Sequence, residues 1–165
     1  MRVFQPRHGA ARSGFTFIEL IMTLAVLSVL VLIAIPSATV AVRQSNERDL
    51  RRALIEIREA LDAYKRAADQ GRIEVKAGES GYPRALRDLV DGAVDIRSPQ
   101  RQRLFFLRRI PRDPFHADPQ TPPEETWGLR SYGSPADAPE PGADVFDTYS
   151  RNESIGLNGI AYRQW

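Results

Sequence analysis

The apolar and charged positions divide the chain into two parts of different character. Residues 20–42 form an apolar run without a charged side chain, and one acid, Glu19, stands directly before it. A helix over that run spans roughly 35 Å, which is enough to cross the hydrocarbon core of a bilayer. Residues 1–14 hold basic side chains and no acid. This order predicts one membrane-spanning helix whose N-terminal side stays in the cytoplasm while the rest of the chain is exported.

The sequence around the run does not fit a secretory signal peptide. Such a peptide has a small-residue cleavage site after its apolar core, and segment 35–39 is the nearest candidate here and a poor one. A small residue, Gly14, lies instead before the apolar run, at the end of the basic segment. Cleavage between Gly14 and Phe15 would remove the basic residues and keep the apolar helix, with a new amino group close to Glu19.

Residues 43–70 are predicted to continue as an amphipathic helix. Their apolar positions recur at alternating steps of four and three and therefore share one face. These positions are Leu50, Leu54, Ile57, Leu61, Tyr64 and Ala68. Acid-first pairs at a spacing of four, Glu47 with Arg51 and Asp62 with Arg66, are expected on the solvated face. The stripe is too short for a stable coiled coil, so packing against a small domain of the same chain is favoured.

Residues 71–165 have a different composition. Gly71 is expected to end the long helix. Ten of the 12 prolines lie in this part, so no further long helix is expected. A short helix is expected to start near Pro83, and two β-prone runs, 126–132 and 144–149, are expected to pair as antiparallel strands on the long helix. The predicted fold class is α+β.

Residues 14–19, with the sequence Gly-Phe-Thr-Phe-Ile-Glu, resemble the class III leader of type IV pilins and type II secretion pseudopilins. Phe17 stands where the family usually has leucine, and Pro36 falls where members commonly have proline. The resemblance rests on a basic leader, a glycine, an aromatic residue, a single glutamate and a membrane-length run in this order. It implies a pilin-like fold, in which a long N-terminal helix packs against a small antiparallel β-sheet head.

The resemblance also implies roles for three residues. Prepilin peptidase would cut between Gly14 and Phe15, and Phe15 would then be N-methylated. Glu19 would pair with the new amino group and set the register of filament assembly, because an acid at the edge of a membrane helix is costly unless it is paired. The other interpretation places Glu19 in the lipid headgroup region, where a charge is cheap.

A second resemblance lies in residues 108–115, which follow an apolar segment and combine arginines with a proline turn. They resemble an element of major pseudopilins, with Ile110 and Phe115 as conservative departures. The segment also fits a core strand that ends in a proline turn, and the two interpretations are compatible. A nucleic-acid patch formed by its three arginines is disfavoured, because no exposed aromatic residues alternate with them and no binding fold is indicated.

Charge and cysteine content restrict the class of protein. The formal charge is +2, and without the three arginines of residues 1–14 it falls to −1, so the basic character of the whole chain is weak support for nucleic-acid binding. There is no cysteine. Many adhesive type IV pilins close their C-terminal region with a disulfide, which this chain cannot form, so its head must be held by packing, hydrogen bonds or a metal.

Calcium is the one cofactor that the resemblance raises. Major pseudopilins bind it in the loop after the last strand, and Asp147, Asn152, Glu153 and Asn158 offer oxygen ligands in the matching region. The paired aspartates that the family has near the end of that loop are absent, and Arg151 intrudes. The prediction is therefore no cofactor and no metal site, with calcium as the alternative.

Catalytic chemistry is not indicated. The two histidines, His8 and His116, lie far apart in the sequence, and there is neither a cysteine nucleophile nor a Gly-x-Ser-x-Gly or phosphate-binding glycine motif. The chain is predicted to be a substrate of prepilin peptidase and not an enzyme.

The resulting prediction is a pseudopilin subunit of a type II secretion system. It divides the chain into a leader (1–14), a transmembrane and filament-core helix (15–42), an amphipathic continuation (43–70) and a periplasmic head (71–165). The protein would span the bacterial inner membrane once, and its partners would be prepilin peptidase, other pseudopilins, further copies of itself and the inner-membrane assembly platform. The alternatives are a type IV pilin of a surface pilus, used in adhesion, motility or DNA uptake, and a membrane-anchored binding module that does not polymerise.

Overall fold

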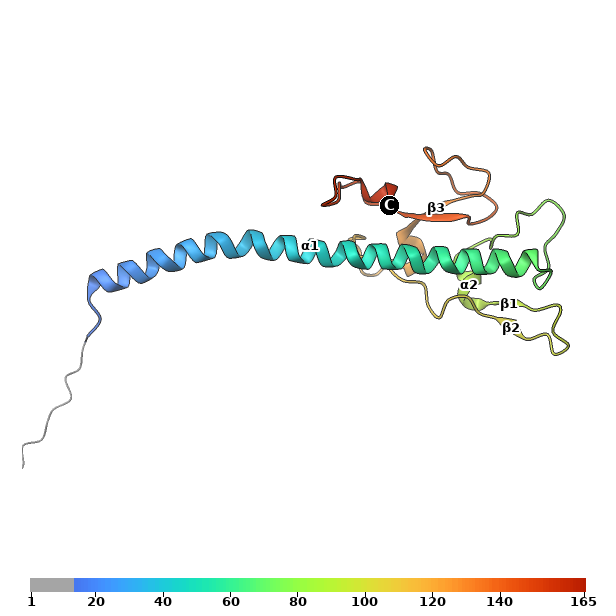
Figure 1. Ribbon diagram of the computed structural model, residues 1–165, viewed down its shortest axis with the longest axis horizontal. Helices are drawn as coiled ribbons and strands as arrows, with labels where there is room; N and C mark the ends of the chain where they lie inside the picture. Colours follow the sequence, from blue (N-terminus) through green and yellow to red (C-terminus); the bar gives the residue numbers. More distant parts are fainter. Residues whose placement is uncertain (1–13) are drawn as a thin grey trace, which may run out of the picture. The chain divides into compact units, whose positions relative to one another are not determined.

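A computed structural model describes residues 14–165, and for residues 32–38 it describes the backbone without the side chains. The fold class is α+β, as predicted, with a long N-terminal helix followed by small antiparallel sheets (Figure 1). The elements in order are α1 (Phe17–Asp69), α2 (Arg87–Asp91), β1 (Ala93–Val94), β2 (Arg103–Leu104), the 3-10 helix η1 (Pro123–Thr126), β3 (Trp127–Arg130), β4 (Asp147–Ser150) and the 3-10 helix η2 (Tyr162–Gln164). The chain divides into two compact units, Met1–Val42 and Arg43–Trp165, and α1 contributes to both.

The part of α1 in the first unit exposes its apolar side chains. Two of its hydroxyl groups bond to their own helix: Thr23 Oγ1 donates to the Leu20 carbonyl at 2.9 Å and Ser28 Oγ to the Leu24 carbonyl at 2.6 Å. Within the described residues, no helix reaches the length and apolarity that a membrane crossing requires. The predicted span includes residues 32–38, whose side chains lie outside that description.

The part of α1 in the second unit buries the predicted apolar face. Leu50, Leu54, Ile57, Leu61 and Ala68 are buried and Tyr64 is half-buried, which confirms the stripe. Residues from α2, from β3, from the connecting segments and from the C-terminal segment complete the core; they are Leu86, Leu89, Leu107, Trp127, Val145 and Tyr162. Each fully buried aliphatic side chain contributes about 1.5–3 kcal/mol, so this face is the main attachment of the head to the helix.

The predicted ion pairs on the helix surface are wrong. Among the described residues, neither Glu47 with Arg51 nor Asp62 with Arg66 forms an ion pair. Glu47 turns into the core, where it is 8% exposed. Arg51 instead places its guanidinium over the ring of Trp165, 4.6 Å from the centroid.

Helix α1 ends as predicted at Gly71. This glycine has φ = +67°, and its N–H donates to the Ala68 carbonyl at 2.8 Å. The N–H of Arg72 donates to the Ala67 carbonyl at 2.9 Å. The two bonds form a Schellman motif, which needs a residue that tolerates the left-handed region.

The short helix expected near Pro83 begins later. The carboxylate of Asp88 accepts hydrogen bonds from the N–H groups of Arg84 and Ala85 at 3.0 and 3.1 Å, so these residues form a turn before α2. Leu86 and Leu89 are buried. The hairpin β1–β2 that follows was not predicted; it pairs Ala93 with Leu104 and Val94 with Arg103.

The antiparallel pair expected from residues 126–132 and 144–149 is present as β3 and β4. Its register runs from Trp127 opposite Ser150 to Arg130 opposite Asp147. Gly128 lies under the ring of Tyr149, and a Cβ atom at this position would come within 2.3 Å of that ring. The strand therefore needs glycine at this point to let the aromatic side chain cross it.

Candidate functional site

The predicted cleavage site lies in exposed, non-helical chain directly before α1. Gly14, Phe15 and Thr16 precede the helix, and the side chain of Phe15 is 82% exposed. A Cβ built at Gly14 would meet no atom within 4 Å. Residues 1–13 lie outside the described residues. On the side of the bond that the structure describes, the backbone between Gly14 and Phe15 is open to a protease.

Thr16 fixes the start of the helix. Its Oγ1 accepts a hydrogen bond from the N–H of Glu19 at 3.3 Å, and its carbonyl accepts one from the N–H of Leu20 at 3.2 Å. Thr16 is thus the N-cap residue, and the spacing Thr-x-x-Glu is that of a capping box. No role was predicted for Thr16, although this spacing is a signal for an N-cap.

Glu19 lies in the first turn of α1, where a negative charge interacts favourably with the helix dipole. Its side chain is exposed, and it forms no ion pair within residues 14–165. The partner predicted for it, an amino group on Phe15, exists only after cleavage. The chain itself brings the three predicted site residues, Gly14, Phe15 and Glu19, to one end of the helix.

Three of the four side chains considered for calcium, those of Asp147, Asn152 and Asn158, are used in other contacts. Asp147 receives hydrogen bonds from Arg58 at 2.8 Å and from Arg130 at 3.2 Å. The side-chain oxygens of Asn152 and Asn158 accept backbone N–H groups two residues further along, which shapes the local turns. In the part of the chain that the structure describes, no three His, Asp or Glu side chains form a group suited to a metal ion.

The segment 108–115, which resembles a pseudopilin element, links parts of the head to one another through hydrogen bonds. Asp113 is 1% exposed, and its carboxylate accepts hydrogen bonds from Ser150 Oγ at 2.6 Å and from the N–H of Phe115 at 2.8 Å. The indole N–H of Trp127 donates to the Pro111 carbonyl at 2.8 Å. Arg112 donates to the carbonyls of a neighbouring loop, so it is not free to bind a phosphate.

A second cluster joins α1 to the C-terminal segment. The buried carboxylate of Glu47 accepts hydrogen bonds from the Tyr162 hydroxyl and the Leu157 N–H, and Arg43 donates to the same hydroxyl at 3.1 Å. Burial raises the pKa of Tyr162, and its bond to Glu47 acts in the same direction. The cluster is structural, and the sequence held a signal for it, because Arg43 and Glu47 continue the buried stripe by steps of three and four.

A cavity of about 680 Å³ lies beside the end of α1, and four of its charged side chains have partners. Arg84 pairs with Glu79, and Asp88 caps the turn before α2. Asp144 accepts hydrogen bonds from Ser80 and from the Tyr132 N–H. These four groups therefore offer little unsatisfied polarity to a ligand.

One comparison with known proteins gives a match. Residues 9–35 match the family model of the prokaryotic N-terminal methylation motif. The matched part contains Gly14, Phe15 and Glu19 and ends within the apolar run. Neither the curated proteins nor the solved structures give a match to the chain. The chain therefore carries an N-terminal methylation motif of the prepilin type. The comparisons name no relative for the head that follows this motif.

Proposed function

We propose that the protein is a pseudopilin subunit of a type II secretion system, which polymerises into a short periplasmic filament that helps to move proteins outward. The observation that carries the proposal is the methylation motif over residues 9–35, joined to a long helix and a small α+β head. Such a subunit acts mechanically, so it needs a surface for processing and a surface for assembly, and no catalytic centre.

Processing follows from the N-terminal geometry. Prepilin peptidase cuts between Gly14 and Phe15, in chain that Thr16 keeps outside the helix. The new amino group of Phe15 is then methylated. It lies close in sequence to Glu19, whose negative charge is costly in an apolar setting and is stabilised by a positive partner of its own or a neighbouring subunit.

Assembly uses the apolar half of α1. Exposed side chains such as Leu20, Leu24, Leu27 and Val31 hold the subunit in the inner membrane before assembly and pack against the same region of other copies in the filament. The absence of cysteine and the Arg-Arg-Ile-Pro-Arg-Asp-Pro element of residues 108–114 favour a secretion pseudopilin over an adhesive pilin.

The test is the intact mass and N-terminal sequence of protein purified from membranes of cells with an active prepilin peptidase. We expect a chain that begins at Phe15 and carries one additional methyl group. A chain that keeps residues 1–14 in those cells would refute the proposal and favour a simple anchored module. Long surface pili on cells that make the processed protein would replace the secretion filament by a type IV pilus.

A further inference from the structure

The short loop between β4 and η2 holds three exposed apolar side chains. They are Ile155, Leu157 and Ile160, which are 60%, 48% and 46% exposed. Residues 155–161, here named the apolar loop, turn back on themselves. Ile155 and Ala161 form an antiparallel bridge, and the N–H of Gly156 donates to the Ile160 carbonyl at 2.8 Å. Exposed apolar side chains gathered in one place are typical of a surface that binds another molecule or a membrane.

The apolar loop is attached to the first charged turn of α1. Arg43 donates a hydrogen bond to the Ile155 carbonyl, and Glu47 accepts one from the Leu157 N–H at 2.7 Å. Arg43 is also the first charged residue after the apolar run 20–42. In Figure 1 the last segment of the chain, drawn in red, lies along the part of α1 that belongs to the second unit. The loop is therefore held by the one turn of helix, about 6 Å long, that follows the apolar run.

The backbone of the apolar loop supplies partners for its own N–H groups. The N–H of Gly159 donates to the Gly156 carbonyl at 3.0 Å, and the N–H of Ile160 donates to the side chain of Asn158 at 3.0 Å. The N–H groups of Gly156 and Leu157 are bonded as described above. An apolar medium does not hydrogen-bond to peptide groups, so a backbone that enters it must satisfy its donors internally. The loop meets this requirement at these four donors.

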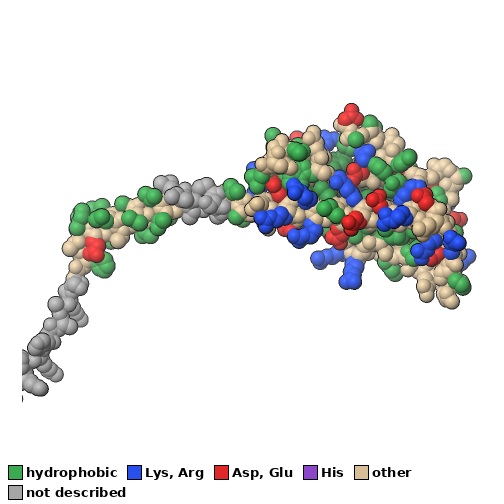
Figure 2. Space-filling view, in the orientation of Figure 1, with side chains coloured by type: hydrophobic (Ala, Val, Ile, Leu, Met, Phe, Trp, Pro, Cys, Tyr) green, Lys and Arg blue, Asp and Glu red, His purple; other side chains and the backbone are tan. Residues whose placement is uncertain are grey.

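Basic and aromatic groups adjoin the apolar loop. Residues 43–52 contain four arginines and two acids, and one of the acids, Glu47, is buried. Figure 2 shows Lys and Arg side chains over the start of the second unit. The guanidinium of Arg51 lies 4.6 Å from the ring centroid of Trp165, whose indole N–H donates to the Ile160 carbonyl at 3.2 Å. Arginine and tryptophan beside apolar side chains suit the boundary between lipid headgroups and acyl chains.

We propose that the apolar loop binds the lipid surface of the membrane in which residues 20–42 are anchored. Ile155, Leu157 and Ile160 enter the upper acyl chains, and the neighbouring arginines lie at anionic headgroups. The inference rests on the proposed function, which supplies the membrane anchor, and goes beyond it, because that function assigns no lipid contact to the head. The contact gives the subunit a second attachment to the membrane and fixes the depth of residues 43–47 at the headgroups.

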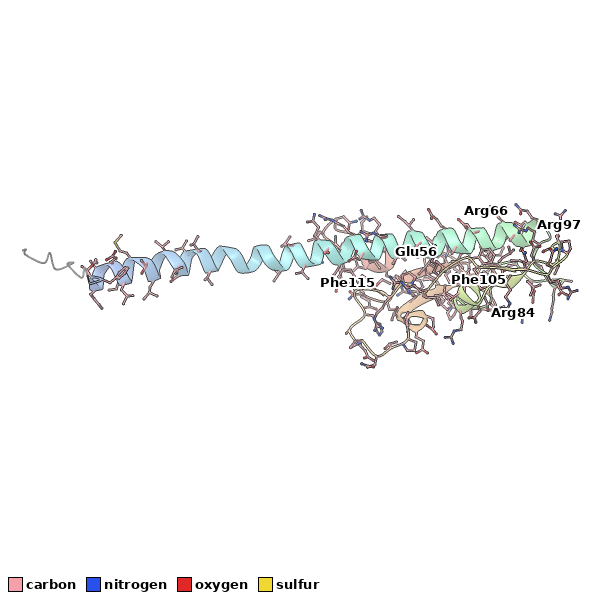
Figure 3. All side chains as sticks on the ribbon, turned by 90° about the horizontal axis from the view of Figure 1, so that it is seen from below. Glu56, Arg66, Arg84, Arg97, Phe105 and Phe115 are labelled. Carbon is pink, nitrogen blue, oxygen red and sulfur yellow. The ribbon has the colours of Figure 1, made fainter. Side chains whose placement is uncertain are left out.

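Other exposed apolar side chains of the head provide matched controls. Ile96 is 50% exposed and Phe105 is 67% exposed, and both adjoin the hairpin β1–β2. This hairpin packs on Ala67, near the end of α1. Twenty residues of helix, about 30 Å, separate Ala67 from Glu47. Arg97, labelled in Figure 3, marks this end of the second unit. The control side chains therefore lie too far along the helix to reach a membrane surface at the apolar loop.

Quenching of a fluorophore by lipid tests the proposal in the full-length chain. The chain has no cysteine, so L157C and the control I96C each accept one environment-sensitive label. The labelled chains are reconstituted at high dilution in vesicles of phosphatidylcholine and phosphatidylglycerol that carry a nitroxide on the upper acyl chain. Quenching at position 157 should exceed quenching at position 96 at least about threefold, because an interfacial segment lies roughly 5–10 Å deep in this boundary. Equal quenching at both positions overturns the proposal.

Tryptophan fluorescence gives a second readout without a label. Trp165 is bonded to the apolar loop and partly exposed, whereas Trp127 is 0% exposed and gives a constant background. The variant I155S/L157S/I160S should lower the quenching of tryptophan by the same lipid at least about twofold, and the control I96S/F105S should leave it unchanged. Equal effects of the two variants overturn the proposal. The labelled chain keeps the other two apolar side chains of the loop, so it remains decisive where the triple variant fails to fold.

Two further outcomes separate this proposal from the proposed function. Quenching at position 157 that is weak at high dilution, with a label that becomes shielded only when many copies share a vesicle, shows that a neighbouring copy covers the loop and overturns the proposal. A chain that is cut at Gly14 and stays in the membrane, but shows no quenching at position 157, leaves the proposed function intact. A chain that alkaline carbonate releases from the vesicles has no membrane anchor and defeats both.

Discussion

The Tyr162 hydroxyl donates a hydrogen bond of 2.8 Å to the Oε1 atom of Glu47. The same oxygen accepts the N–H of Leu157 at 2.7 Å, and the Glu47 side chain is only 8% exposed. Arg43 lies one turn earlier on α1 and donates to the Tyr162 hydroxyl and to the Ile155 carbonyl. One turn of the helix thus holds the C-terminal segment in place.

Replacing Glu47 by alanine should lower the free energy of unfolding by about 2–3 kcal/mol, because the buried hydroxyl of Tyr162 and the part-buried N–H of Leu157 lose their acceptor. Urea unfolding of the full chain in detergent measures this change. Glu56→Ala is the matched control, since Glu56 is an exposed acid on the same helix and its removal should change stability by about 0.5 kcal/mol or less. Equal losses from both variants would contradict the role of Glu47.

Replacing Asp113 by alanine should cost about 2–4 kcal/mol, because its buried carboxylate accepts hydrogen bonds from Ser150 and Phe115. Asp113→Asn keeps one acceptor oxygen and should cost less. A double-mutant cycle with Ser150→Ala should show a coupling of about 1 kcal/mol. Strict additivity of the two changes would show that the two side chains do not interact.

Replacing Thr148 by valine should stabilise the protein by about 1 kcal/mol. Thr148 is 0% exposed, and its Oγ1 has no hydrogen-bond partner among the described residues. Valine has nearly the same shape and removes the unsatisfied hydroxyl. Thermal unfolding checks the effect, with Thr126→Val as the control, because the hydroxyl of Thr126 is bonded and its loss should destabilise. A lower melting temperature for T148V would contradict this prediction.

Acid should weaken the contact between Arg72 and Asp95. Arg72 donates to Asp95 Oδ2 at 2.6 and 2.9 Å, and this interaction lowers the pKa of Asp95 below its ordinary value of 3.8. Because the folded-state pKa is the lower one, the stability from this carboxylate is complete above the ordinary value and is lost as pH falls through the lowered pKa.

The measurement is the free energy of unfolding of wild type and D95N as a function of pH. Wild type should be the more stable above pH 3.8, and the difference should shrink as pH falls below that value. Hydrogen bonds also lower the pKa values of Glu79 and Asp118, but both proteins share those groups, so the difference isolates Asp95. A difference that does not vary with pH would contradict the assignment.

Replacing Thr16 by alanine should loosen the first turn of α1 by about 1 kcal/mol, because the N–H of Glu19 loses its acceptor. Hydrogen exchange at the Glu19 amide should accelerate about fivefold, since that free energy corresponds to such a factor. Thr16→Ser keeps the capping oxygen and should exchange as wild type does. Equal exchange in both variants would show that Thr16 does not cap the helix.

The sequence predicted the structural elements that follow from hydrophobic periodicity or from a strong local signal such as a glycine at a helix end. Leu50, Leu54, Ile57 and Leu61 recur at helical spacing, and their burial follows from that pattern alone. The end of α1 at Gly71 follows from the backbone freedom of glycine. The pairing of β3 with β4 follows from two β-prone runs separated by a proline-rich loop.

Features that depend on contacts between distant segments were not predicted. The two-residue strands β1 and β2 have no periodicity, and their pairing depends on Gly92, where a Cβ would lie 2.7 Å from the Leu104 carbonyl oxygen. Glu47 was assigned to an ion pair with Arg51 because the sequence does not show that Tyr162, far along the chain, supplies a better donor. Burial of Asp113 likewise depends on Ser150.

For the candidate site, sequence reasoning found Gly14, Phe15 and Glu19 through a linear motif, which needs no knowledge of the fold. The family match covers these three residues, while their roles in processing and assembly stay predictions. The N-cap at Thr16 could also have been predicted from the sequence, because Thr16 and Glu19 are only three residues apart.

The attachment of the C-terminal segment to α1 has a consequence for the order of folding. Its hydrogen bonds join residues separated by 110 to 119 positions, as between Glu47 and Leu157 or Arg43 and Tyr162. Loop closure over such a distance is slow compared with formation of the helix itself. In the export that we propose for this chain, residues 43–47 would therefore cross the membrane before their partners. The packing around Glu47 stays incomplete until the C-terminal segment with Leu157 and Tyr162 arrives. Until then the chain exposes the unsatisfied carboxylate of Glu47 to solvent or to other proteins.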